Sequence, residues 1–296
     1  MRVTDGNLFR SVTYRVNRAK EQLDKLTEQI SSGKTANRLG DDPLVVQSII
    51  RNDEATQRTE QFSVNNINVR NQLQVYESTV AETYEIISQM KSEVISIANE
   101  STSYEQRQAM IEKLDLYKEQ LIALANTSHN DSYIYSGYKT DSHAYDENGV
   151  YQGDNGAIEA EVMEGVTIKT NMDGGQVFGG GSNPNTTDLF QLVEDLKTSM
   201  NGNFPEDATD LFDEIDQVAD QVIRARSEIG ARLVYCDIAD NSLQRLEISN
   251  IEMRQQIEEV DYAEALVQYK SQELALNATL QTNSTLMLPS LLDYVR

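Results

Sequence analysis

The chain has 296 residues, of which 48 are acidic and 25 are basic, so its formal charge is −23. That charge argues against nucleic acid or anionic lipid as a partner, because phosphate groups are recognised by Lys and Arg. A single cysteine excludes an intrachain disulfide and a Cys-rich metal site, and only four prolines permit long helices.

The N-terminal segment shows a coiled-coil pattern. Its apolar side chains recur at alternating spacings of three and four residues, which predicts one narrow apolar seam on a helix. This seam consists of Phe9, Val12, Val16, Ala19, Leu23, Leu26 and Ile30. The same segment lacks the apolar h-region of a cleaved secretory signal, and no apolar run along the chain reaches the length of a membrane span.

A break follows this first helix. Gly33 after Ser32 favours a helix end, because the residue past a C-terminus often needs a positive φ. Asp41 or Asp42 predicts a helix cap, and Pro43 suits the first helical position. The aspartates also permit a metal or acid–base pair, but a cap next to the helix dipole is the simpler interpretation. We therefore expect a joint between two helices.

Two further helices are predicted before residue 130. Both carry the same alternating spacing of apolar residues. The first seam consists of Val69, Leu73, Tyr76, Val80, Thr83, Ile87, Met90, Val94 and Ile97, and the second of Met110, Leu114, Tyr117, Leu121 and Leu124. Thr102 and Glu105 predict a capping box between them, and the short polar break predicts an antiparallel return.

The pattern changes to β at residues 133–178. Asn148-Gly149 and Asn155-Gly156 are tight-turn signals. Residues 158–162 alternate apolar with acidic side chains, and Gly165 precedes the β-branched run 166–170. The Asp-rich loops at 141–156 do not match the EF-hand spacing, so turn chemistry is preferred to a calcium site. We expect a small β unit here.

Helix resumes beyond residue 188. A seam runs through Leu211, Ile215, Val218, Val222, Ala225, Ile229, Leu233 and Cys236, on which Cys236 is interpreted as a small buried hydrophobe. Gly230 and Arg232 lie on this helix and are predicted to serve rod packing. A glycine costs about 1 kcal/mol relative to alanine inside a helix, so we expect a close helix approach at Gly230. The run from Asp188 to Asp220 has ten acidic residues against Lys197 alone, which indicates a solvated face or a surface that repels wrong contacts.

The two ends of the chain are electrostatically complementary. Residues 1–40 carry eight basic and four acidic residues, a net of +4, whereas residues 240–296 carry four basic and nine acidic residues, a net of −5. The C-terminal assembly seam is predicted to comprise Met253, Ile257, Val260, Val267, Leu274, Ala278, Leu291 and Leu292. So few seam side chains do not offset the entropy of ordering both arms, and we expect the arms to fold only when neighbouring copies cover them.

Several motifs resemble the flagellin-type proteins of the bacterial flagellum. They are QISSGK (29–34) with DDP (41–43), YIYSG (133–137), ARSEIGARL (225–233), DYAEALVQY (261–269) and LLDYV (291–295). They occur in order over nearly the whole chain. The Pro43-Leu44 continuation, the opening MRVTDGNLF and the small single β insertion resemble the hook–filament junction member of this family more than a filament flagellin.

The resemblance implies a mainly α fold: a long antiparallel coiled-coil rod with paired N- and C-terminal helices and a small central β domain. The implied divisions are an inner coiled-coil domain (1–38 with 247–296), a helical rod (39–132 with 187–246) and a small β-rich outer domain (133–186). The inter-domain joint is then formed by Ser32, Gly33, Asp41, Asp42 and Pro43.

The resemblance also implies a role and partners. The expected role is a structural adaptor that joins a hook-associated ring to the filament and is exported without a cleaved signal peptide. The expected partners are copies of the chain itself in a ring, hook-associated protein 1, flagellin and a flagellar export chaperone. No cofactor, metal or catalytic set of residues is predicted. Two alternatives stay open at this point: a filament flagellin, and an intracellular coiled-coil scaffold.

Overall fold

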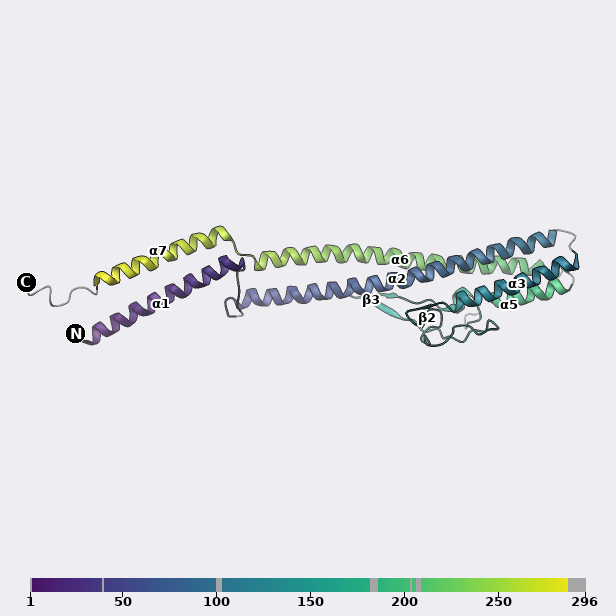
Figure 1. Ribbon diagram of the computed structural model, residues 1–296, viewed down its shortest axis with the longest axis horizontal. Helices are drawn as coiled ribbons and strands as arrows, with labels where there is room; N and C mark the ends of the chain where they lie inside the picture. The colour runs from purple at the N-terminus through teal and green to yellow at the C-terminus, as the bar shows by residue number, and fades with distance from the viewer. Residues whose placement is uncertain are drawn as a thin grey trace, which may run out of the picture. The chain divides into compact units, whose positions relative to one another are not determined.

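A computed structural model describes residues 2–38, 40–99, 103–181, 186–202, 204–205 and 209–286. The helices are α1 (Arg2–Ser32), α2 (Pro43–Asn99), α3 (Tyr104–Ala125), α4 (Gly174–Val177), α5 (Leu189–Asn201), α6 (Thr209–Glu258) and α7 (Tyr262–Leu286), and the strands are β1 (Ser128–His129), β2 (Ser132–Tyr133), β3 (Glu159–Met163) and β4 (Val166–Lys169). The fold is therefore mainly α with a small β region, as predicted (Figure 1). None of the described helices is long and apolar enough to cross a membrane.

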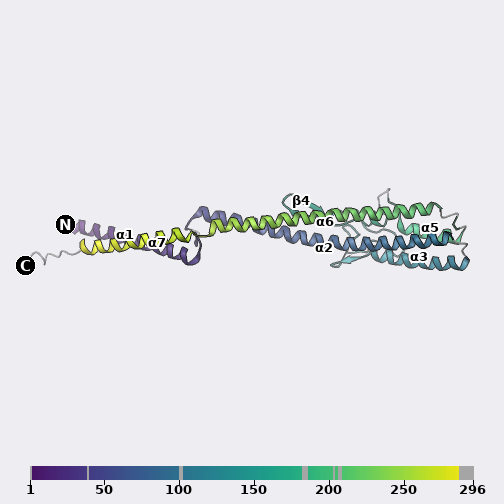
Figure 2. The same ribbon diagram turned by 90° about the horizontal axis from the view of Figure 1, so that it is seen from above.

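The chain divides into two compact units. Unit 1 comprises residues 1–58 and 246–296, and unit 2 comprises residues 59–245. The long helices α2 and α6 contribute one part to each unit. Within unit 2 these two helices lie side by side in both views (Figures 1 and 2).

The core of unit 2 follows the predicted seams. On α2, the eight seam residues from Val69 to Val94 are buried, and Thr83 is tolerated there because its hydroxyl donates to the carbonyl oxygen of Thr79 over 2.8 Å. On α6, Ile215, Val218, Val222, Ala225, Ile229 and Cys236 are buried against the same cluster. The interpretation of Cys236 as a small buried hydrophobe is confirmed, and its burial raises the pKa of the thiol.

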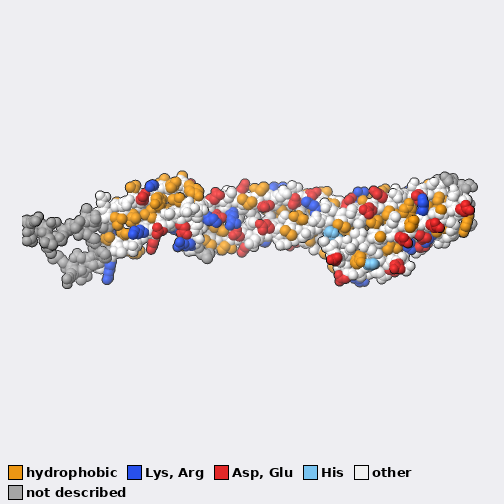
Figure 3. All heavy atoms as spheres, in the orientation of Figure 1, with side chains coloured by type: hydrophobic (Ala, Val, Ile, Leu, Met, Phe, Trp, Pro, Cys, Tyr) orange, Lys and Arg blue, Asp and Glu red, His pale blue; other side chains and the backbone are white. Residues whose placement is uncertain are grey.

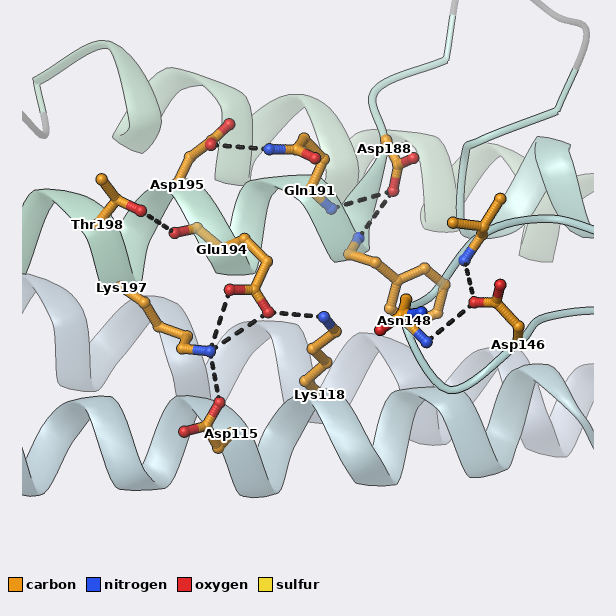
Figure 4. Close-up of polar contacts among 12 residues, drawn as sticks. Asp115, Lys118, Asp146, Asn148, Asp188, Gln191, Glu194, Asp195, Lys197 and Thr198 are labelled. Carbon is orange, nitrogen blue, oxygen red and sulfur yellow. Dashed lines mark hydrogen bonds and ion pairs between the residues drawn. The ribbon is translucent and has the colours of Figure 1, made fainter.

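Helices α3 and α5 pack together and share a small ion-pair network (Figure 4). The Lys118 ammonium lies 2.6 Å from Glu194 Oε1, and the Lys197 ammonium lies 2.6 Å from Asp115 Oδ1. These two lysines lower the pKa of the Glu194 carboxyl. Lys197, the one cation of the acidic run, thus joins α5 to α3. The N-terminus of α3 corrects our prediction: the capping box is formed by Ser103 and Gln106, and Thr102 lies outside the described residues.

The β region consists of two hairpins. Strand β1 pairs with β2 around the turn Asn130-Asp131, whose residues have φ of 51° and 61°. Strand β3 pairs antiparallel with β4, and Gly165 provides the φ of 72° that the connecting turn needs. The expected alternation at 158–162 and the turn at Gly165 are confirmed as a hairpin.

Aromatic rings fasten the β region to the helices. Tyr135 packs edge-on against Tyr76 of α2 with the ring centroids 5.2 Å apart, and its hydroxyl lies 2.6 Å from that of Thr79. Tyr145 contacts Phe190 of α5 with centroids 5.0 Å apart. Burial raises the pKa of Tyr76 to about 12. All four rings are buried and the three tyrosine hydroxyls are hydrogen-bonded, so their role is packing.

The two residues predicted for rod packing behave differently. Arg232 donates from Nη1 to the carbonyl oxygens of Asn171 over 2.9 Å and Lys169 over 3.3 Å, so it ties the end of β4 to α6. Our prediction of a close helix approach at Gly230 is wrong within this chain. A Cβ built on Gly230 meets no described atom within 4 Å.

Candidate assembly interface on the terminal helices

The terminal helices α1 and α7 form a pair within unit 1 (Figures 1 and 2). On α1, Leu26 is buried and the rest of the described N-terminal seam is half-buried: Val12, Val16, Ala19, Leu23 and Ile30. The side chain of Phe9 lies outside the described residues. The expectation that the two ends of the chain pair with each other is therefore met.

The face of α7 toward α1 is not the predicted seam. Ala265 is buried, and Tyr269, Gln272, Leu276 and Thr279 are half-buried, at the spacings of four and three that one helix face requires. Val267, Leu274 and Ala278 of the predicted seam are exposed, the first two by 70% and 69%. The sequence pattern runs two residues out of phase with this packing, because the helix breaks between Glu258 and Tyr262 and restarts.

A second joint thus lies opposite the predicted one, and the two are bonded through their backbones. The N–H of Thr35 donates to the carbonyl oxygen of Glu258 over 2.8 Å, and the N–H of Val260 donates to that of Gly33 over 3.0 Å. This makes a short antiparallel bridge between Lys34 and Glu259. The two polar breaks therefore satisfy each other's backbone groups where the helices end.

Close packing at the joint depends on Gly33. Its φ of 74° is confirmed as the positive value expected after a helix C-terminus. A Cβ on Gly33 would lie 2.7 Å from the Oη of Tyr262, the first residue of α7. Glycine is thus favoured by the backbone conformation, and a Cβ would in addition displace the hydroxyl of the exposed Tyr262.

The two aspartates of the joint have different roles: Asp42 caps α2, and Asp41 holds the loop before it. Asp42 Oδ1 accepts the N–H groups of Leu44 over 3.0 Å and Val45 over 3.3 Å, which caps α2 where Pro43 begins it. Asp41 Oδ2 instead accepts the N–H of Arg38 over 3.0 Å, and that hydrogen bond is the main cause that lowers the pKa of Asp41. The second joint has its own cap, since Asp261 Oδ1 accepts the N–H groups of Ala263 and Glu264.

Glu258 is the electrostatic centre of the two joints. Its carboxylate pairs with the Lys34 ammonium, and its Oε2 lies 2.9 Å from the Nε of Arg254. Arg254 in turn reaches Asp53 Oδ1 on α2 over 2.9 Å. The pKa of Glu258 is lowered, mainly by its hydrogen bond with Lys34 and next by that with Arg254. The Glu258 side chain is only 15% exposed. Sequence reasoning missed this residue, although its position just before the Asp261 cap was a usable signal.

A face of unit 1 exposes apolar side chains that the chain itself does not cover. Figure 3 shows hydrophobic side chains gathered over α7. Exposed apolar side chains on α7 and on the last turns of α6 are Ile248, Ile251, Met253, Tyr262, Leu266, Val267, Leu274 and Leu280. Ile257 and Val260 are half-buried, whereas Leu291 and Leu292 lie outside the described residues. A contiguous exposed apolar face of this kind is typical of a surface that binds another protein.

A groove separates part of this face from α1. It has a volume of about 520 Å³ and is lined from α1 by Leu26 and Gln29 and from α7 by Val267 and Ser271, among others. Among the described residues no cluster of three or more His, Cys, Asp or Glu side chains could hold a metal ion. The site therefore offers apolar surface and ion pairs, the means of association between helices.

Proteins of the bacterial flagellum are similar to this chain in sequence. The model of the bacterial flagellin N-terminal helical region matches residues 9–140. The flagellar hook-associated protein 3 of Salmonella typhimurium is 24% identical over 309 residues, covering 95% of this chain and 96% of the relative. The protein of the same name in Escherichia coli is 21% identical over 300 residues and covers 94% and 95%.

Solved structures share the fold. A protein of Vibrio parahaemolyticus described as a flagellar hook-associated protein superposes with a TM-score of 0.68 and 22% identity, over 74% of this chain and 100% of its own. The flagellar junction protein FlgL of Legionella pneumophila gives 0.60 and 15%, over 72% and 100%. The chain thus carries a match to the bacterial flagellin N-terminal helical region over residues 9–140, and it is similar over nearly its whole length to proteins named flagellar hook-associated protein 3.

Proposed function

We propose that the chain is a structural adaptor of the bacterial flagellum, which joins the hook side to the flagellin filament. One observation carries the proposal: the similarity to hook-associated protein 3 spans 95% of this chain and 96% of that relative. A match of this extent includes both terminal helices as well as the small β region. The adaptor reading needs no catalytic chemistry, and we assign none to the chain.

The paired terminal helices supply the means of attachment. In unit 1 the pair α1–α7 uses only one face of each helix, and the apolar side chains of α7 around Val267 and Leu274 are left exposed. A single pair of helices with an exposed apolar face gains free energy when further helices cover it. We propose that copies of this chain in a ring, and the proteins on either side of the ring, provide that cover.

The partners follow from the same role. Hook-associated protein 1 is proposed to contact the arms on the hook side and flagellin on the filament side. A flagellar export chaperone is proposed to hold the arms before export through the flagellar export route. The arms are proposed to fold on assembly, with α1 and α7 as their folded form. The division into an inner coiled-coil domain, a rod and an outer β domain, with the joint at 32–43, remains part of this proposal.

The joints suit this role because they fix the arms relative to the helices that follow them. Within unit 1, the Thr35–Glu258 and Gly33–Val260 backbone bonds fasten both chain breaks together. An adaptor must present two surfaces at a fixed spacing, and two independent hinges would not maintain it. We propose that the paired joints provide this fixed geometry.

Filament flagellin is the second candidate, since the family model itself describes a flagellin region. Relatives named hook-associated protein 3 that cover the whole chain favour the adaptor. The same relatives count against an intracellular scaffold.

Deletion of the gene tests the proposal. The expected phenotype is cells with hooks but no filaments, and with flagellin shed into the medium. Re-expression of the full chain restores filaments, and purified protein alone forms only short assemblies. Filaments that persist after deletion, or long filaments seeded by the purified chain alone, would contradict the adaptor role.

A further inference from the structure

Helix α6 carries a second exposed stripe within unit 2. Ile223, Ser227, Gly230, Val234 and Ile238 follow one another at spacings of four, three, four and four residues, which places them on one face of the helix. Ile223 is 44% exposed, Val234 59% and Ile238 57%. The buried seam of α6, with Val222, Ile229 and Cys236 among its members, lies on another face. The stripe is therefore additional to the packing that holds unit 2 together.

Gly230 lies at the centre of this stripe, and no contact within the described chain requires a glycine at this position. Its φ is not in the left-handed region, and a Cβ there would meet nothing within 4 Å. A glycine inside a helix lowers stability, and a common reason for one is that another backbone approaches closely. Because no described atom lies within 4 Å of a Cβ at Gly230, a helix that approaches this glycine closely would have to come from another molecule.

A groove continues the stripe toward α2. It has a volume of about 320 Å³ and is lined by Tyr84 of α2 and by Val222, Ile223, Arg226 and Ser227 of α6. Arg226 is fixed at its edge by Glu77, with Nη2 2.7 Å from Oε1. The surface is thus both apolar and grooved. Side chains of a second helix can pack into a groove of this kind.

The charges around the stripe point to a second copy of this chain. Arg224 and Arg245 border it, and neither has a hydrogen bond or ion pair among the described residues. The preceding turns of α6 present carboxylates without ion pairs, among them the exposed Asp213 and Asp220. Helix α6 therefore carries arginines without an ion pair beside the stripe and carboxylates without an ion pair in the turns before it, among the described residues. In a chain with a net charge of −23, a second copy of α6 supplies the complement to each.

We propose that the Gly230 stripe, defined as Ile223, Ser227, Gly230, Val234 and Ile238, is the surface through which unit 2 packs against a second copy of this chain. The inference deepens the proposed function, because it rests on the chain assembling with itself. It differs from the arm interface: it lies on the long helix of unit 2, and its contacts are independent of whether α1 and α7 are folded.

Photo-crosslinking of the full chain tests this surface. Ala231→Cys places a thiol beside Gly230, and Ala123→Cys places one at a matched exposed alanine on α3. Both variants are labelled with a benzophenone maleimide. Wild-type protein is the labelling control because its one cysteine is buried. We expect covalent dimers from the Ala231 position and not from Ala123, in concentrated purified protein and in flagella of the bacterium that encodes the chain.

A second variant tests whether the crosslink depends on Gly230. Gly230→Leu in the Ala231→Cys background fills the space that the second helix needs, so dimer yield falls by roughly tenfold, the usual result of overpacking a close contact. The thermal midpoint of the dilute protein does not fall, because the leucine meets open space in its own chain. Equal dimer yields from the two thiol positions, or a yield unaffected by Gly230→Leu, would overturn the inference.

The two proposals fail separately. If the crosslinks are absent but deletion of the gene removes filaments, the adaptor role stands and the Gly230 stripe is not its contact. If the crosslinks form but deletion leaves filaments intact, the chain self-associates through this stripe and the adaptor role is wrong.

Discussion

Val260 donates its backbone N–H to the carbonyl oxygen of Gly33 over 3.0 Å, although the two residues are separated by most of the chain. This hydrogen bond connects the segment that follows α1 to the segment that precedes α7. It lies beside the ion pair of Lys34 with Glu258, so backbone and side chains hold the two joints at one place. The predictions for unit 1 concern the assembled protein, in which the arms are folded, and test how much of the stability of unit 1 depends on these contacts.

Gly33→Ala is expected to destabilise unit 1. The substitution forces a Cβ into the left-handed region and against the Tyr262 hydroxyl, at a cost of about 1–3 kcal/mol. Native-state amide exchange of α1 and α7 measures the loss as faster exchange in both helices. Gly40→Ala is the matched control, because Gly40 has no neighbour within 4 Å and no positive φ. Equal exchange rates in the two variants would show that the joint does not need its glycine.

Glu258→Gln is expected to loosen both joints together. It removes the ion pairs with Lys34 and Arg254, and because these groups are partly exposed the loss is about 1 kcal/mol. The amides of Thr35 and Val260 should exchange faster, which hydrogen exchange followed by NMR measures. Glu273→Gln removes the exposed pair with Lys270 on α7 alone and serves as control. No difference between the two variants would contradict a central role for Glu258.

Much of unit 2 was predictable because its helices bury one continuous seam. From Val69 to Val94 the alternation of apolar residues on α2 corresponds to buried side chains without a phase error. The β3–β4 hairpin was predictable because Gly165 and the alternating residues before it act locally. Local signals of this kind need no knowledge of what lies across the sequence.

Unit 1 was less predictable because its packing depends on partners distant in sequence. The apolar spacing from Ile257 to Val260 and Val267 gives no sign of a break, yet Asp261 caps a new helix there and shifts the buried face by two residues. Gly230 posed a different difficulty. The glycine suggested a close helix approach, which the chain itself does not make, and spacing alone cannot show whether a helix of another molecule makes it.

Gly230→Ala is expected to stabilise the dilute protein by about 1 kcal/mol, because alanine has the higher helix propensity and its Cβ meets no neighbour. Urea unfolding followed by circular dichroism measures the change. Ser242→Ala, at another half-buried position of α6, separates a general propensity gain from one specific to the glycine. A loss of stability at Gly230 would mean that α6 is packed against another element there.

Arg232→Ala is expected to loosen the β3–β4 hairpin. Its guanidinium serves the carbonyl oxygens of Lys169 and Asn171, and loss of hydrogen bonds from a charged donor costs about 2 kcal/mol. Amide exchange in β3 and β4 reports the change, and Arg224→Ala, which removes an exposed arginine without an ion pair, is the control. If the amide exchange rates of both strands are unchanged in the Arg232 variant, apolar contacts alone attach the hairpin to α6.

Acid is expected to weaken the two joints of unit 1. The folded-state pKa values of Glu258 and Asp41 are lowered, so the unfolded chain binds more protons at these groups. Their contribution is complete above their unfolded values of 4.5 and 3.8 and is lost as pH falls through the folded values. The amide chemical shifts of Thr35 and Val260 should therefore move below about pH 4.5, while those of the α2 seam around Tyr76 stay constant. In Glu258→Gln the Val260 shift should lose most of this dependence, because the remaining titration belongs to Asp41 at the other end of the joint. A wild-type profile in the variant would place the titrating group elsewhere.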